Sequence, residues 1–129
     1  MKTFLKIPEY IFKLYISLLV LFVISCGSRN ASNSYRTTTV SYYADRFSSK
    51  PTSSGEIYRH SRLTASNKTL AFGTRVEIVN VKNEKSVIIT VNDRGPLNPS
   101  REFDLSQAAF KKITTLNEGI AKVKYRILK

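Results

Sequence analysis

The sequence predicts a small, mainly β domain that closes as a barrel, with one short helix near its C-terminal end. Short runs of β-branched and aromatic residues recur after residue 37, and turn-forming residues separate them at close spacing. One segment near the C-terminus has the character of a capped helix instead. The chain has 129 residues, which suffices for one domain and not for two.

Residues 1–25 predict a secretory leader that precedes the fold. Lys2, Lys6 and Lys13 make a positive start, and an apolar run from Leu14 to Ile24 follows. This run is too short to span a bilayer, which needs about 20 apolar residues, but it has the length of a signal-peptide core.

The end of the leader resembles a bacterial lipobox, because the small residue Ser25 precedes Cys26, the only cysteine. The resemblance implies that the Cys26 thiol takes a diacylglycerol and that the leader is cut immediately before it. An uncleaved anchor helix and an ordinary secreted protein with a stray thiol are the alternatives. A single cysteine excludes an internal disulfide. Gly27 is not an acidic retention signal, so we expect a lipid anchor in the outer membrane, facing the periplasm.

The remaining chain divides near residue 37. Residues 26–37 are small and polar and predict a lipidated cysteine followed by a flexible tether, and residues 38–129 predict the folded domain. The net charge is +12, of which the leader contributes +2, so the rest of the chain carries +10. This charge suits an anionic partner such as stem-peptide carboxylates or lipid head groups, or it serves solubility alone. An exported chain argues against a nucleic-acid partner.

Three strands are predicted in the first two thirds of the domain. Thr38–Ala44 is rich in β-branched and aromatic residues and predicts a strand, and Ser48–Gly55 predicts a loop. Thr74–Lys82 alternates between two faces, whereas Ser86–Val91 is nearly continuously apolar and predicts a strand buried on both faces. A turn at Asn83 and Glu84 joins these two strands into a hairpin.

A loop, a helix and a closing strand are predicted in the last third. The residues from Leu97 to Arg101 predict a polar loop. A short helix follows, with Asp104 or Ser106 accepting backbone N–H bonds at its start. Residues 120–127 then alternate between polar and apolar side chains, which predicts a strand with one polar face.

Asp93 is the leading candidate for a catalytic group. It lies where a buried strand meets a loop with Gly95 and Pro96, and such loops hold reactive groups on a rigid support. Partial burial is expected to raise the pKa of its carboxyl, as a general acid requires at neutral pH. Capping of the turn, or a pair with Arg94, is the structural alternative. Glu56, in a polar loop, is a second candidate carboxylate, and a solvated surface position is its alternative.

Several segments taken together resemble the rare lipoprotein A family. They are Ser41–Asp45 (SYYAD), Thr52–Glu56 (TSSGE), Leu63–Thr74 (LTASNKTLAFGT), Val91–Pro96 (VNDRGP) and Arg101–Ser106 (REFDLS). The motifs follow one another in the family's order, and the resemblance runs from about Ser41 to Leu128. It implies a six-stranded double-psi β-barrel with one or two short helices.

The resemblance also implies an activity. Family enzymes are lytic transglycosylases, a class of lyase that cleaves the bond between N-acetylmuramic acid and N-acetylglucosamine in peptidoglycan and leaves a 1,6-anhydro end. Asp93 would then act as acid and base, and Glu56 would support it or position substrate. No metal or organic cofactor is implied. The expected partners are peptidoglycan glycan strands and a membrane, reached through the lipid anchor, and we expect a monomer.

Four further residues are predicted to contact the substrate: Tyr43, Thr64, Asn67 and Arg94. Tyr42 and Tyr43 lie on opposite faces of a strand, so one joins the core and the other can stack on a sugar ring. Arg94 either binds a substrate carboxylate through two hydrogen bonds or pairs with an acidic neighbour such as Asp104.

Asn67 stands where the family motif has histidine. Asparagine can hydrogen-bond a sugar but cannot shuttle a proton. A non-catalytic, expansin-like peptidoglycan-binding lipoprotein is therefore the alternative function. His60, the only histidine, is expected in an exposed loop. The alternative is that this loop folds back and places the imidazole in the substrate cleft. The chain ends at Lys129 without the SPOR domain that many members carry, so we expect no septal recruitment by that route.

Overall fold

The computed structural model describes residues 8–11, 13, 14 and 34–129. Cys26 and the segment from residue 26 to residue 33 lie outside the described residues, as does most of the predicted leader. The chain divides into two units, Met1–Ser32 and Asn33–Lys129, and every element named below belongs to the second. None of the helices formed by the described residues is long and apolar enough to span a bilayer.

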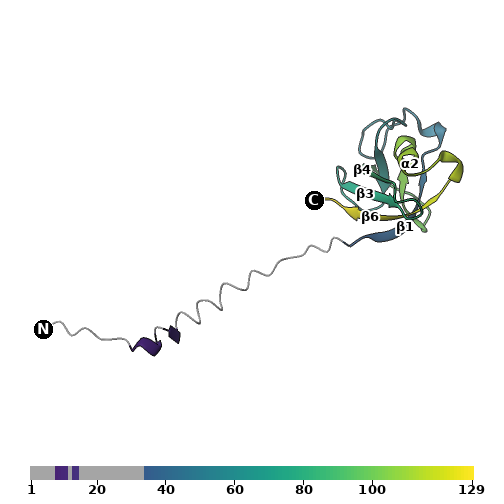
Figure 1. Ribbon diagram of the computed structural model, residues 1–129. Coiled ribbons are helices and arrows are strands. Elements are labelled where there is room, and N and C mark those ends of the chain that lie inside the picture. The colour runs from purple at the N-terminus through teal and green to yellow at the C-terminus, as the bar shows by residue number, and fades with distance from the viewer. Residues whose placement is uncertain (1–7, 12, 15–33) are drawn as a thin grey trace. The chain divides into compact units, whose positions relative to one another are not determined.

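Six strands of the second unit form a closed barrel (Figure 1). Around the barrel they lie in the order β1, β5, β2, β4, β3, β6. β1 and β5 pair in parallel, as do β2 and β4, and the other neighbours are antiparallel. The strands are β1 (Arg36–Tyr42), β2 (Thr64–Asn67), β3 (Arg75–Asn80), β4 (Ser86–Asp93), β5 (Arg101–Leu105) and β6 (Ala121–Ile127). This closed six-stranded arrangement confirms the predicted fold class.

Four of the strands coincide with predicted segments. β1 begins two residues before the predicted Thr38, and β3 and β4 form the predicted antiparallel hairpin. β6 buries alternate side chains beneath a polar face, as expected. The prediction that the β4 segment is buried on both faces is wrong, because Ile88 is 42% exposed while Val87 and Ile89 point inward. β4 therefore has one solvent-facing side in its first half.

β2 and β5 were not predicted as strands. β5 lies where the sequence indicated a polar loop and the start of a helix, so Asp104 belongs to a strand and does not cap a helix. Ser106 is the cap: its Oγ accepts a hydrogen bond from the Ala109 N–H at the start of α2 (Gln107–Ile113). Both strands are short and largely polar, and their pairing with longer neighbours overrides weak local preference.

The interior of the barrel is filled by inward side chains from every strand. Val40, Val91, Phe103 and Val123 are fully buried in this core, and Phe110 of α2 packs with them. Burial of each such side chain stabilises the fold by about 1.5–3 kcal/mol. The core gives the strand ends a rigid base. Two 3₁₀ helices, η1 (Asp45–Phe47) and η2 (Leu116–Glu118), complete the unit.

Candidate active site

A pocket of about 480 Å³ lies beside the ends of β1, β2 and β4. Ser66 of β2 is the register partner of Asp93 on β4 and also of Asp104 on β5. Directly paired residues project from the same face of a sheet, so three adjacent strands present these side chains in a row. From the strand spacing, the Cα atoms of the two aspartates are roughly 10 Å apart. All three residues line the pocket.

Three donors hold the Asp93 carboxylate. The Tyr43 hydroxyl donates to Oδ2 at 2.7 Å, and the backbone N–H groups of Ser53 and Arg94 donate to Oδ1 at 2.9 and 2.8 Å. Burial by itself would raise the pKa of Asp93, but the hydrogen bonds from Ser53 and Tyr43 outweigh it and lower the pKa below its ordinary value. The prediction of a raised pKa is therefore wrong for the free protein, in which Asp93 is ionised at neutral pH.

Tyr43 is a fixed hydrogen-bond donor in this pocket. Burial raises the pKa of its hydroxyl well above the ordinary value, and the bond to Asp93 raises that pKa further, so the proton stays on Tyr43. Its ring stacks on Tyr58 with the centroids 4.3 Å apart. Tyr42 points the other way, packs against the core and donates to the Leu116 carbonyl at 3.0 Å. The prediction that the two tyrosines face opposite sides is confirmed.

Asp104 is the second carboxyl in the pocket, and sequence reasoning gave it no catalytic role. It is half-buried, and Nε of Arg101 donates to its Oδ1 at 3.1 Å. Burial raises the pKa of Asp104, and the charge of Arg101 opposes this only in part. Asp104 therefore holds a proton more readily than Asp93 does. The register that brings the two together was not visible in the sequence, because β5 was not predicted.

Arg94 lines the pocket but forms neither predicted carboxylate pair within the described residues. Its Nη1 donates to the carbonyls of Asn67 and Leu70 at 3.2 and 2.8 Å, and the guanidinium lies 4.0 Å from the centroid of the Phe72 ring. The predicted pairing with Asp104 is wrong, since Arg101 occupies that carboxylate. The predicted contact between Arg94 and substrate stays a prediction.

Asn67 and Thr64 are buried, and neither is among the residues that line the Asp93 pocket. The Asn67 Oδ1 accepts from the N–H groups of Thr69 and Leu70 at 3.0 and 2.8 Å. Its Nδ2 donates to the Glu102 carbonyl at 3.0 Å. These bonds make Asn67 a residue that shapes the loop after β2.

Glu56 is exposed at the edge of the site. Its Oε2 accepts from Asn92 Nδ2 at 3.4 Å, and Ser54 of the same loop donates its N–H to the Asn92 carbonyl at 3.3 Å. The loop is therefore docked on the residue before Asp93, which explains how Ser53 reaches the carboxylate. Glu56 itself is not among the lining residues of the pocket.

His60 lies behind the pocket and does not line it. Its Nδ1 is 2.8 Å from the Tyr58 hydroxyl and its Nε2 is 3.4 Å from Asp45, and its side chain is 28% exposed. Since Tyr58 stacks on Tyr43, His60 supports the wall behind the donor to Asp93. Across the described part of the chain, no group of three or more His, Cys, Asp or Glu side chains is placed to hold a metal ion.

Strand order, barrel closure and the carboxylate pocket at the strand ends together define a double-psi β-barrel protein. The family model described as "Lytic transglycolase" matches residues 36–125, and the chain belongs to this family. The match spans β1 to β5 completely and β6 as far as Tyr125.

Relatives of known name agree with this assignment. The chain is 49% identical over 83 residues to a "Probable endolytic peptidoglycan transglycosylase RlpA" of Treponema pallidum, covering 64% of this chain and 26% of the relative. It is 45% identical over 89 residues to the "Endolytic peptidoglycan transglycosylase RlpA" of Neisseria meningitidis serogroup B, covering 69% of this chain and 37% of the relative. The chain thus spans between a quarter and two fifths of these relatives. The resemblance to the rare lipoprotein A family is confirmed.

Two solved structures share the fold. Streptomyces papain inhibitor aligns with a TM-score of 0.62 and 21% identity, covering 74% of this chain and 96% of that one. The expansin of Clavibacter michiganensis aligns with a TM-score of 0.60 and 17% identity, covering 74% of this chain and 51% of the expansin. At these identities the likeness concerns the fold alone.

Proposed function

We propose that this protein is a lytic transglycosylase of the cell envelope, which cleaves peptidoglycan between N-acetylmuramic acid and N-acetylglucosamine. The observation that carries the proposal is a pocket with two carboxyl groups, Asp93 and Asp104, whose pKa values are shifted in opposite directions. Such a pair supplies an acid and a base to one reaction. The names of the relatives support peptidoglycan as the substrate.

The reaction needs one proton donor and one proton acceptor. A proton passes to the glycosidic oxygen as its bond to the anomeric carbon breaks, and the leaving sugar takes that bond's electron pair. The 6-hydroxyl of the muramic acid then bonds to the anomeric carbon and gives its proton to a carboxylate. The products are a 1,6-anhydro end and a free 4-hydroxyl, and no water is consumed.

The pocket divides these tasks between its two carboxyls. Asp93, ionised and held by Tyr43 and Ser53, accepts the 6-hydroxyl proton and stabilises positive charge at the anomeric carbon. Asp104 donates the proton to the leaving oxygen, since burial raises the pKa of its carboxyl above the ordinary value. Glu56 and Arg94 position the sugars at the edge of the pocket.

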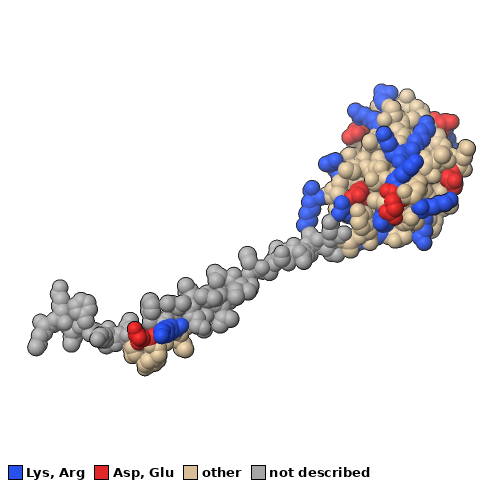
Figure 2. Space-filling view, viewed as in Figure 1, with Lys and Arg blue, Asp and Glu red and all other residues tan. Residues whose placement is uncertain are grey.

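The surface of the second unit suits a wall polymer that carries carboxylates. Figure 2 shows more Lys and Arg side chains than Asp and Glu side chains on the viewed face of this unit. This charge attracts anionic strands over a distance limited by the salt of the medium. Lipidation of Cys26 and anchoring in the outer membrane are part of the proposal, and so are the leader, the tether and a monomeric state.

The test is incubation of the purified protein with isolated peptidoglycan, followed by mass spectrometry of the soluble products. We expect anhydro-ended fragments, and a loss of at least about 100-fold in their rate of formation with Asp93→Asn. Glu84→Gln is the matched control, since Glu84 is an exposed carboxylate in the β3–β4 turn. A wild-type protein that binds glycan and releases no fragments would establish the expansin-like alternative.

A further inference from the structure

A second hollow, of about 380 Å³, adjoins the Asp93 pocket. Its lining residues are Tyr42, Ala44, Asp45, Gln107 and Leu116. Two of them, Tyr42 and Ala44, also line the Asp93 pocket, so the two hollows meet at the exposed Ala44. Since Tyr43 and Asp45 are two residues apart, their Cα atoms are separated by at most about 7 Å. A polymer held at Asp93 can therefore place a neighbouring unit in the second hollow.

The η1 segment directs side chains into both hollows. Arg46 and Phe47 line the Asp93 pocket, whereas Asp45, the first residue of η1, lines the second hollow. The Asp45 side chain is 93% exposed. Gln107 Nε2 and the His60 ring approach this carboxylate at 2.8 and 3.4 Å, and both do so at Oδ1. Within the described residues, Oδ2 is therefore free to accept a hydrogen bond from a ligand.

Gln107 brings a second hydrogen-bond acceptor to the hollow. This residue is only 9% exposed, and its Nε2 donates to the Tyr43 carbonyl at 3.0 Å as well as to Asp45. Both amide protons are thus used, while no donor in the described part of the chain bonds its Oε1. No fully buried side-chain oxygen of that part lacks a partner, so Oε1 is accessible from the hollow.

We propose that this hollow binds an N-acetylglucosamine unit of the glycan strand, beside the sugars at the cleaved bond. The acetamido N–H and the hydroxyls of this sugar are donors that match the two free acceptors, Asp45 Oδ2 and Gln107 Oε1. Leu116, which is partly buried, offers apolar contact to the acetyl methyl group. No Lys or Arg lines the hollow, and Asp45 repels the carboxylate of an unsubstituted muramic acid. The inference rests on the proposed function, because it assigns another sugar of the same substrate to a site.

Hydrogen bonds hold the hollow in shape before a ligand binds. The Tyr42 hydroxyl donates to the Leu116 carbonyl at 3.0 Å, which fixes η2 against β1. The bond from Gln107 to the Tyr43 carbonyl joins the start of α2 to the residue that holds Asp93. A sugar bound in the hollow is thereby anchored at a fixed distance from Asp93, which orients the strand for reaction.

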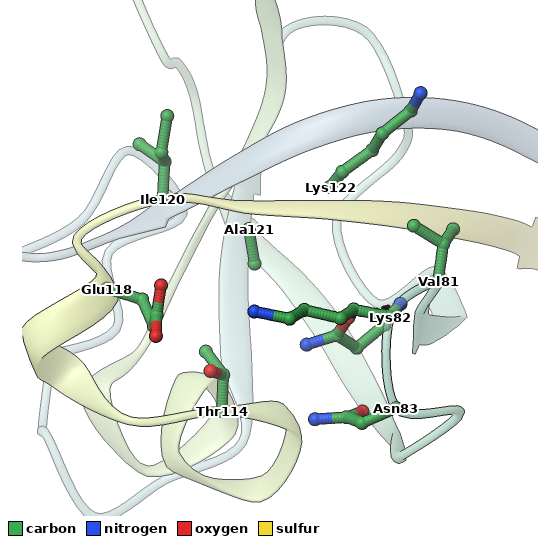
Figure 3. Close-up of a pocket in the computed structure, with 9 residues that line it drawn as sticks. Val81, Lys82, Asn83, Thr114, Glu118, Ile120, Ala121 and Lys122 are labelled. Atoms are coloured by element: carbon green, nitrogen blue, oxygen red, sulfur yellow. Dashed lines mark hydrogen bonds between the residues drawn. The ribbon is translucent and has the colours of Figure 1, made fainter.

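A larger pocket, of about 510 Å³, lies at the turn between β3 and β4 and shares no lining residue with either hollow. Figure 3 shows Lys82 and Glu118 on one side of β6, and Lys122 and Ile120 on the other. Its charged side chains therefore do not converge on one ligand. Glu118 is an exposed carboxylate outside the two hollows, which makes it a matched control for Asp45.

The test is calorimetric titration of the purified protein with β-1,4-linked N-acetylglucosamine oligomers, a trimer and a hexamer. We expect the hexamer to bind roughly tenfold more tightly, the ratio that one or two additional hydrogen bonds supply. Asp45→Asn should weaken hexamer binding roughly three- to tenfold and leave trimer binding unchanged, and Glu118→Gln should change neither. The cellulose hexamer has the same linkage without acetamido groups, so it should gain less over its own trimer.

Kinetics on isolated peptidoglycan separate this inference from the proposed function. Asp45→Asn should slow the release of anhydro-ended fragments through KM rather than kcat, because it removes binding that substrate and transition state share. An absent length dependence, equal losses in Asp45→Asn and Glu118→Gln, or an equal gain with the cellulose hexamer would each overturn the inference and leave the proposed function in place. Length-dependent binding that needs Asp45, without fragment release, would support this sugar site and overturn the catalytic proposal.

Discussion

Removal of the Tyr43 hydroxyl tests how the pocket keeps Asp93 ionised. In Tyr43→Phe, Asp93 loses the 2.7 Å hydrogen bond to Oδ2 and keeps the two backbone donors on Oδ1. A hydrogen bond to a charged group contributes about 1.5–3 kcal/mol, and partial exposure of this pair favours the lower end. We therefore expect a loss of about 1–2 kcal/mol in the free energy of unfolding at neutral pH. The melting temperature should fall by about 4–8 °C for each kcal/mol.

The pH dependence of this loss identifies the carboxylate as its cause. The folded-state pKa of Asp93 is lowered from 3.8, so its contribution to stability is present above that pH and is lost as pH falls through the folded value. The deficit of Tyr43→Phe should therefore shrink in acid. Tyr42→Phe is the matched control, since it removes a hydroxyl bonded to the neutral Leu116 carbonyl and should show a deficit independent of this titration. Urea denaturation at neutral and acidic pH measures both, and a Tyr43→Phe deficit that is absent or the same at both pH values would refute the reasoning.

Four further outcomes are expected. Ser106→Ala should lower the free energy of unfolding by about 2–3 kcal/mol in urea denaturation, because its fully buried Oγ caps α2 and also bonds the β2 backbone; a loss under 0.5 kcal/mol would contradict this. Asn67→Ala should cost about 1–3 kcal/mol in the same assay through the lost backbone bonds, and an unchanged stability would argue against its loop-shaping role. Glu56→Gln should leave stability within about 0.5 kcal/mol while slowing glycan cleavage, and an unchanged rate would remove Glu56 from the site. Asp104→Asn should slow cleavage by about 100-fold, and the wild-type rate should fall as pH rises through the pKa of Asp104; full activity in the variant would reassign the proton donor.

The sequence was sufficient to predict the four longer strands of the barrel. β1, β3, β4 and β6 have six to eight residues and are rich in β-branched or apolar side chains, whereas β2 and β5 have four and five residues and are largely polar. The short strands exist because longer neighbours supply their pairing, which no local pattern records. The row of Asp93, Ser66 and Asp104 depends on both of them, and so it could not be predicted.

The electrostatics of Asp93 could not be predicted for a related reason. Its position at a strand end was evident from the Gly-Pro loop that follows it, and burial was the only influence on its pKa visible in the sequence. The donors that reverse the shift, Ser53 and Tyr43, are 40 and 50 residues away along the chain. Only the folded barrel brings them within hydrogen-bonding distance.

We propose that the Asp93 pocket breaks glycan strands without water. Digestion of purified peptidoglycan in water labelled with oxygen-18, read by mass spectrometry, tests it most directly. We expect 1,6-anhydro ends that carry no label and that disappear with Asp93→Asn. Labelled reducing ends, or anhydro ends that form equally well in the variant, would contradict it.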